Sequence, residues 1–201
     1  MANAIERVLS EPVLDKTMRL FWAKGYAQTP IEEIVTVTGF NRAAIYSRFG
    51  GKRGLFLAML DRYRHRVTAR LLDPLRRPED GLDAIAAFYR QLAETPELAE
   101  HSLGCLLVAT AADQANLDAP ASALVASYLE ELTALIRAAL ENARDQGRLC
   151  PAVDAAASAD FLAGNVLGLM TLARWPAPSR AFHNQIDEVL RYLHGLEKEQ
   201  Q

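Results

Sequence analysis

Cysteine is scarce in this sequence, and the signatures of several kinds of site are missing. The 201 residues include only two cysteines, Cys105 and Cys150, which stand far apart and belong to no CxxC motif or Cys/His cluster. Neither a disulfide framework nor a metal site is indicated, and we expect no metal and no cofactor. The chain also lacks a Gly-rich phosphate loop, a nucleophile elbow, an HExxH motif and paired carboxylates on an apolar face, which argues against an enzyme.

Long apolar runs and targeting signals are missing too. No run approaches the roughly 18 residues of a spanning helix. The N-terminal stretch MANAIERVLSEPVLD lacks the charged-then-apolar order of a secretory signal. The composition, 50% hydrophobic and 23% charged, is that of an ordinary globular protein that can fill a core. We therefore expect a cytoplasmic protein without a membrane partner.

Positive charge is present but unevenly placed. The net charge is -3, yet residues 1–53 carry eight Lys or Arg against five acids, and the remainder carries fourteen against twenty. Between Arg42 and Arg70 there are eight Lys or Arg and a single acid, Asp61. Such a block is often only a solvated face, but on an acidic protein it also suits a polyanion partner.

Helical periodicity extends along the chain, and no segment alternates like a strand for more than a few residues. An apolar stripe from Val13 to Trp22 predicts a first helix that ends at Gly25. Longer helices are predicted over residues 52–72, 80–95, 98–116, 121–146, 154–175 and 179–197. With the two short helices described next, the prediction is an all-α fold of about nine helices.

The two short helices carry start and stop signals at close spacing. Thr29 and Glu32 predict a capping box for the first of them, with Pro30 at the first helical position. Gly39 ends this helix, and Asn41 can cap the next one, RAAIYSRF. Two short helices joined by a tight turn predict a helix-turn-helix, in which the second helix enters the major groove of DNA.

The side chains of these helices divide into a small core and an outward face. The predicted core is Ile31, Ile34, Val35, Phe40, Ile45 and Phe49. On the outward face, Arg42 can read guanine or bind a phosphate, and Ala43 lets the helix approach the groove closely. Lys52, at the start of the next helix, can also bind a phosphate. Thr29 can do the same together with the backbone amides in the first turn of the helix that follows it. The predicted DNA-binding residues are Thr29, Asn41, Arg42, Ala43, Tyr46, Ser47, Arg48 and Lys52.

Residues 13–60, VLDKTMRLFWAKGYAQTPIEEIVTVTGFNRAAIYSRFGGKRGLFLAML, resemble the N-terminal domain of the TetR family of bacterial transcriptional repressors. The segments IYSRF and KGY, and Lys52 with LF behind it, are the most specific parts. The resemblance implies phosphate contacts from Thr29, Tyr46 and Lys52 and groove contacts from Arg42, Ala43 and Ser47. Here Gly51 replaces a serine-like cap, Arg48 stands where histidine is common, and the first helix is preceded by the acidic SEPV.

The resemblance implies two domains, a helix-turn-helix domain over residues 1–51 and a ligand-binding and dimerisation domain over 52–201. The stretches at 104–113 and 147–174 are similar to one large subgroup of the family. Segment 154–175 is apolar nearly all round, so it must be buried on several sides, either by a two-fold partner or as the central helix of a monomer. The predicted dimer interface is Phe161, Gly164, Leu167, Gly168, Ile186, Val189, Leu190 and Leu193.

A small-molecule pocket is expected between the C-terminal helices. The candidates to line it are Met59, Tyr63, Phe88, Tyr89, Cys105, Met170 and Trp175, and core packing is the alternative role for each. Some members of the subgroup with a cysteine at the position of Cys105 look like sensors of electrophiles or oxidants, and the resemblance extends that possible role to Cys105. Its leucine neighbours favour a buried, inert thiol instead.

These patterns together predict a homodimeric repressor that binds a palindromic operator in double-stranded DNA. An inducer in the C-terminal core would shift the helix over 52–72 and move the recognition helices out of register with the grooves. Two alternatives stay open: a repressor that senses electrophiles or oxidants through Cys105, and a module that binds a protein rather than DNA through the basic block.

Overall fold

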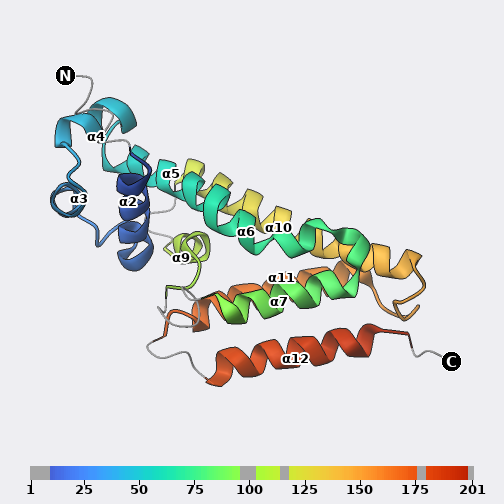
Figure 1. The fold of residues 1–201 in the computed structure, drawn as a ribbon. Helices are drawn as coiled ribbons and strands as arrows, with labels where there is room; N and C mark the ends of the chain where they lie inside the picture. Colours follow the sequence, from blue (N-terminus) through green and yellow to red (C-terminus); the bar gives the residue numbers. More distant parts are fainter. Residues whose placement is uncertain (1–9, 96–102, 114–117, 176–179, 199–201) are drawn as a thin grey trace. The chain divides into compact units, whose positions relative to one another are not determined.

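The structure, a computed structural model, describes residues 10–95, 103–113, 118–175 and 180–198 (Figure 1). Within these ranges every regular element is a helix, and the only extended pairing is an isolated bridge between Leu149 and Glu197. The predicted all-α fold is confirmed. The chain forms two compact units: Met1–Arg66 with Leu106–Val125, and Val67–Cys105 with Ala126–Gln201.

The first unit contains α2 (Glu11–Lys24), α3 (Ile31–Thr38), α4 (Arg42–Phe49), α5 (Lys52–Tyr63), α9 (Leu106–Ala112) and the start of α10 (Ala119–Asp145). The apolar stripe predicted for α2 is its buried face, where Phe21 packs edge-on to Phe56 of α5 with ring centroids 5.1 Å apart. Trp22 packs on Tyr63 in the same manner at 4.8 Å. Aromatic pairs of this geometry add to the free energy gained from burial, so α2 and α5 form the core of this unit.

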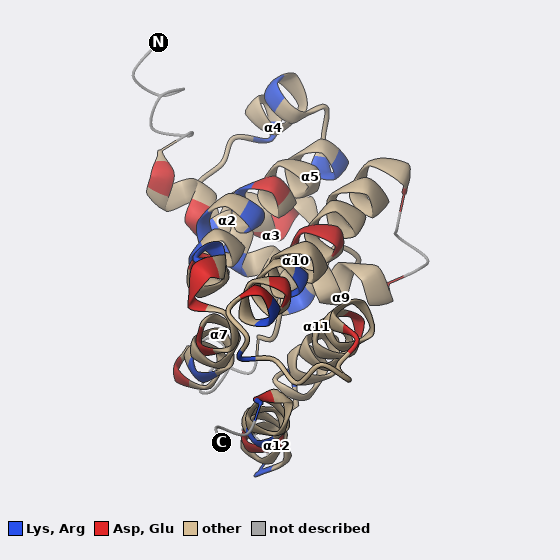
Figure 2. Cartoon of the chain, turned by 90° about the vertical axis from the view of Figure 1, so that its right-hand side faces the viewer, with Lys and Arg blue, Asp and Glu red and all other residues tan. Residues whose placement is uncertain are grey.

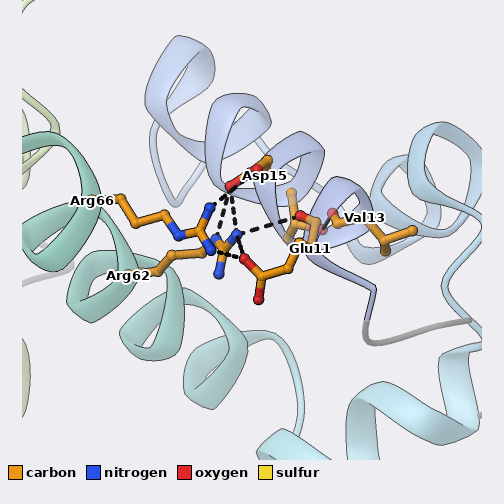
Figure 3. A network of polar contacts seen from close by, with 6 residues as sticks. Glu11, Val13, Asp15, Arg62 and Arg66 are labelled. Atoms are coloured by element: carbon orange, nitrogen blue, oxygen red, sulfur yellow. Dashed lines mark hydrogen bonds and ion pairs between the residues drawn. The ribbon is translucent and has the colours of Figure 1, made fainter. Parts of the chain in front are cut away.

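An ion-pair cluster also joins α2 to the far end of α5 (Figure 3). The Arg62 guanidinium, with only 11% of the side chain exposed, donates to Asp15 at 2.7 and 2.9 Å and to Glu11 at 2.7 Å. Arg66, one turn further along, pairs with the same two carboxylates. Because Arg62 is mostly buried and bonded to two acids, the cluster holds these two helices together more firmly than an exposed pair would.

The segment after α5 is not a regular α-helix. A π-helical turn occupies Arg64–Thr68, followed by the short α6 (Ala69–Leu71) and two 3-10 turns at Asp73–Arg76 and Pro78–Asp80. The helix predicted over 52–72 therefore extends to Leu71 as expected, but it contains a π-helical turn. The N-terminal segment of the first unit ends at Arg66, inside the π-helical turn, and the division predicted from the sequence, residues 1–51 and 52–201, stays a prediction.

The second unit is built from α7 (Leu82–Glu94), most of α10, α11 (Ala155–Leu172) and α12 (Arg180–Leu196). Figure 1 shows α7, α11 and α12 side by side. The buried hydroxyl of Tyr89 on α7 donates to the carbonyl of Leu162 on α11 at 2.7 Å. Arg148 bonds Asp83 and Glu197, which ties the loop after α10 to α7 and to the end of α12.

Among the described residues, α11 is the one helix that is long and apolar enough, by length and composition, to cross a membrane. Its 18 residues have a mean hydropathy of 1.3, although only 44% of them are buried. The side chains of Ser158 and Asn165 are polar, and Asp160 is charged. The helix packs against α12 and is bonded to α7, as expected of a helix in the core of a helical domain.

Two predicted helices lie partly outside the described residues. Of the helix expected over 98–116, residues 103–113 are described and form a helix over Leu106–Ala112. Of the helix expected over 179–197, the described part forms α12. The remaining long helices begin and end within a few residues of the predicted positions.

Candidate nucleic-acid interface

Helices α3 and α4 form a helix-turn-helix with the local signals expected from the sequence. Gly39 adopts a left-handed conformation at φ 71°, and its amide closes α3 on the carbonyl of Val35. The Asn41 side chain then accepts from the Ala43 amide at 2.8 Å and caps α4. A glycine that reverses the chain and a side-chain cap directly after it make the turn tight.

The predicted core of this motif is largely confirmed. Ile34, Phe40 and Ile45 are at most 1% exposed, and Ile31 is 8% exposed. Val35 and Phe49 are half-buried, with the Phe49 ring edge-on to Phe40 at 6.3 Å. This apolar contact fixes the two helices relative to each other, so the outward face of α4 is presented by a rigid support.

The outward face of α4 carries the side chains that the sequence predicts to meet DNA. Figure 2 shows basic segments and no acidic ones on this helix. Tyr46 is 54% exposed although it is large and aromatic, and its ring lies beside Gly51. Exposed together on α4 or at its cap are Asn41, Arg42, Ala43, Tyr46, Ser47 and Arg48. A basic, acid-free helix face with an exposed aromatic side chain is suited to phosphates and base edges.

Lys52 is half-buried at the start of α5, directly after this helix. Its ammonium group lies 4.3 Å from the centre of the Tyr26 ring, a cation–π contact. Burial lowers the pKa of Lys52, and the negative charge of Glu32 opposes that shift. The contact with Tyr26 places the lysine at the edge of the exposed face rather than extended into solvent.

The predicted capping box at the start of α3 is wrong. Thr29 is fully buried, and its hydroxyl donates to the carbonyl of Gly25 at 2.7 Å, which satisfies the end of α2 instead. The N-cap of α3 is Pro30, without a side-chain cap. The Thr29 side chain therefore does not lie on the exposed face with the other predicted DNA-binding residues.

Glu32, released from the capping role, forms a contact that sequence reasoning missed. Its carboxylate accepts from Nη1 of Arg42 at 2.9 Å, across the turn between the two helices. The available signal was the run of cations from Arg42 to Arg53 beside two acids in the first turn of α3. A ten-residue separation gave no periodicity that would pair Glu32 with Arg42.

The candidate ligand-binding residues are divided between the two units and differ in exposure. Met59 and Tyr63 belong to the first unit, where Met59 borders an open pocket of about 600 Å³ that Arg48, Arg62 and Arg66 also line. In the second unit, Trp175 is 63% exposed. The remaining four candidates, Phe88, Tyr89, Cys105 and Met170, are at most 2% exposed in that unit.

Cys105 lies beside Tyr128 of α10 in this core. Burial raises the pKa of the Tyr128 hydroxyl, and the neighbouring Cys105 thiol adds to the shift. Only 1% of Cys105 is exposed. A thiol in these surroundings has little access to reagents in water.

The candidate dimer residues divide between the surface and the core. On α11, Phe161 is 53% exposed, Gly164 and Gly168 are exposed, and Leu167 is half-buried. On α12, Leu190 is half-buried. In contrast, Ile186, Val189 and Leu193 are each 3% exposed and pack inside the single chain, because they form the face of α12 directed at α7 and α11.

Comparison with known proteins agrees with the helix-turn-helix. Residues 13–59 match the family "Bacterial regulatory proteins, tetR family", and residues 78–187 match the "Tetracyclin repressor-like, C-terminal domain". The HTH-type transcriptional repressor ComR of Escherichia coli (strain K12) is 28% identical over 169 residues, 82% of this chain and 79% of ComR.

Two solved structures share the fold over most of both chains. A TetR transcriptional regulator from Chloroflexus aurantiacus J-10-FL has a TM-score of 0.78 and 26% identity, and the match covers 98% of each chain. The regulator CifR, solved as a cysteine mutant with 26 bp double-strand operator DNA, has a TM-score of 0.72 and 21% identity over 91% of this chain and 94% of CifR. The chain described here belongs to the TetR family of bacterial transcriptional regulators.

Proposed function

We propose that this regulator is a repressor that binds a palindromic operator as a homodimer and leaves it when a small molecule binds. The observation that carries the proposal is the exposed, acid-free face of α4, supported by a buried core and flanked by Lys52. ComR, with which the chain shares 28% identity, is a transcriptional repressor, and CifR has been solved with operator DNA.

The side chains of α4 divide between two roles in this proposal. Arg42, Ala43 and Ser47 read base edges in the major groove, because they lie on the outward face of the helix. Tyr46 and Lys52 bind phosphates, with Asn41 and Arg48 at the edges of the contact. Since Thr29 is buried, we assign the contact proposed there to the backbone amides of the first turn of α3.

Dimerisation through α11 and α12 accounts for an exposed strip that a monomer would leave in water. Phe161 packs on Tyr192 of α12 with ring centroids 5.1 Å apart, and Gly164 and Gly168 continue the strip along α11. Glycines let two helices approach closely, so the strip suits a two-fold packing of four helices. The symmetry would place two copies of α4 one turn of DNA apart, roughly 34 to 36 Å.

Release by an inducer requires a change that reaches α4 from the C-terminal unit. The π-helical turn Arg64–Thr68 lies in the helical segment that joins the units, and such turns often mark functional positions in a helix. A ligand in the second unit would bias this segment, and α5 would carry the change to α4. We place this mechanism ahead of thiol sensing because Cys105 is only 1% exposed.

As a bacterial regulator, the protein would act in the cytoplasm, because that is where its operator DNA lies. In vitro selection of genomic fragments by the purified protein, near physiological salt, tests the proposal. Enrichment of one palindromic site would support it, and equal binding to all fragments by a folded dimer would count against it. A protein-binding module would also lack the steep loss of DNA affinity between about 50 and 200 mM salt that phosphate contacts produce.

Two substitutions separate the assigned roles. Replacing Arg42 with alanine should remove about 1–3 kcal/mol of discrimination at one base position. Lys52→Ala should instead weaken the binding of all DNA sequences alike. It should also lower the slope of log affinity against log salt concentration by about one. Lys24→Ala is the control, because Lys24 pairs with Glu33 at the end of α2. Fluorescence anisotropy on the selected site and on single-base variants measures both effects, and identical sequence preferences for the two variants would contradict the division.

A further inference from the structure

We propose that Glu32 determines specificity: it holds Arg42 for contact with base edges and weakens the binding of DNA of arbitrary sequence. The proposal rests on the DNA-reading role of α4 given above. It concerns the acid of the first turn of α3 that faces the cations of the neighbouring helix across the turn.

The geometry of the pair is set by the helix-turn-helix itself. Glu32 is the second residue of α3 and Arg42 the first of α4, and the two helices are fixed by the buried contact around Phe40. The Nη1–Oε1 distance is 2.9 Å. One N–H group of Nη1 is used here, and arginine has five, so enough remain for the O6 and N7 acceptors of a guanine.

Folding explains only part of the presence of an acid here: Glu32 lies in the first turn of α3, where a carboxylate interacts favourably with the helix dipole, and Glu33 beside it has the same advantage. The Arg42 and Glu32 side chains are 59% and 65% exposed, and an ion pair with this exposure contributes little to the free energy of unfolding. The position is costly for a protein that binds a polyanion, because the carboxylate repels phosphates. A carboxylate that faces Arg42 at this place therefore has a consequence for DNA binding as well as for folding.

Glu32 acts on more than one of the proposed DNA contacts. Besides its bond to Arg42, its charge is felt by Lys52 at the start of α5. It thus weakens the local positive potential at two cations together. The other acid of α3, Glu33, pairs instead with Lys24 on α2, so it is the natural control for Glu32.

The consequence differs between random DNA and an operator. Binding to random DNA comes almost entirely from neutralised phosphates, so a nearby carboxylate lowers it directly. Binding to an operator adds base contacts, and Arg42 that is already oriented loses less side-chain freedom when it makes them. Glu32 therefore raises the ratio of operator affinity to random-DNA affinity, since specificity can come from penalising the wrong partner.

The test compares Glu32→Gln with Glu33→Gln, two neighbouring substitutions that each remove one negative charge. Dissociation constants are measured by fluorescence anisotropy for the duplex selected by the full-length protein and for a scrambled duplex, at about 50 to 200 mM salt. Glu32→Gln should bind the scrambled duplex about 3- to 10-fold more tightly and lower the operator-to-scrambled ratio. Glu33→Gln should leave that ratio within about twofold of the wild type. Glu32→Ala should repeat the Glu32→Gln result.

The outcomes separate this inference from the proposed function. A ratio that stays the same in Glu32→Gln, or that falls equally in Glu33→Gln, would overturn the role of Glu32 while the wild type still prefers its operator. If the wild-type protein shows no preference for any selected duplex, both the inference and the DNA-reading role fall together. Thermal unfolding of each variant, followed by circular dichroism, should match the wild type because the pair is exposed.

Discussion

Gly54 shows how much one residue decides in the DNA-binding unit. It lies in the first turn of α5, where a Cβ atom would overlap the carbonyl oxygen of Phe49 at the end of α4. The overlap involves backbone, which cannot turn aside as a flexible side chain can. The absence of a side chain at Gly54 therefore allows α5 to start so soon after the recognition helix.

We expect Gly54→Ala to destabilise the protein by about 2–4 kcal/mol, as overpacked cores do when the backbone must move. Gly195→Ala in α12 is the matched control, since nothing lies within 4 Å of a Cβ there. Alanine at that helical position should be neutral or stabilise by up to about 1 kcal/mol. Urea unfolding followed by circular dichroism measures both, and equal effects would contradict the packing explanation.

At the scale of elements, α9 and the start of α10 belong to the unit that holds the helix-turn-helix. Arg53 of α5 donates from Nε to the Asp118 carboxylate at 2.6 Å, and the same carboxylate caps α10 by accepting from the Ala121 amide at 3.0 Å. The hydrogen bond from Arg53 lowers the pKa of Asp118, and the Ala121 amide adds to this. One carboxylate thus joins a helix of the binding motif to a segment more than fifty residues away.

Asp118→Asn should remove the charge but keep the cap, because asparagine also accepts from the helix amides. A lowered pKa in the folded state means that Asp118 contributes stability above its ordinary pKa, about 3.9, and loses it as the pH falls through the lower folded value. The variant should therefore melt below the wild type at pH 7, and the difference should shrink on acidification below about pH 4. Thermal unfolding at the two pH values checks this, and a difference independent of pH would show that the charge is not responsible.

For the whole molecule, the main question is what covers the exposed side of α11. Phe161 on α11 is 53% exposed, and Trp175, three residues after the end of that helix, is 63% exposed. Exposed apolar patches are typical of interaction sites. A second copy of the chain is the partner that the proposed two-fold operator requires.

Gly164→Arg tests that partner directly. Nothing lies within 4 Å of a Cβ at Gly164 in one protomer, so a single chain should accept the longer side chain, whereas a packed partner helix would not. We expect a shift from dimer to monomer at micromolar concentration, with at least about a tenfold loss of operator affinity. Ala134→Arg, at an exposed position of α10, adds the same charge and should change neither. Sedimentation velocity gives the oligomeric state, and an unchanged dimer in Gly164→Arg would exclude this interface.

The sequence by itself determined the helices, the turn between α3 and α4, and the basic face of α4. Each depends on residues within a few positions of one another: an apolar repeat at helical spacing, a glycine with positive φ at Gly39, and the cap at Asn41. Where two local interactions competed, the sequence was ambiguous. Thr29 could cap α3 or bond Gly25, and only the folded packing decided for Gly25.

Tertiary structure decided the remaining features because they join distant residues. The pairs Glu32–Arg42 and Arg53–Asp118 have no periodic signal, and neither has the cluster of Arg62 with Glu11 and Asp15. On α11 and α12 the sequence does not distinguish the apolar residues of the chain's own core from those of an interface with a partner. Packing within the chain buries Ile186, Val189 and Leu193 and leaves Phe161 exposed. A helix face that already packs against other helices of the same chain is not available to a partner.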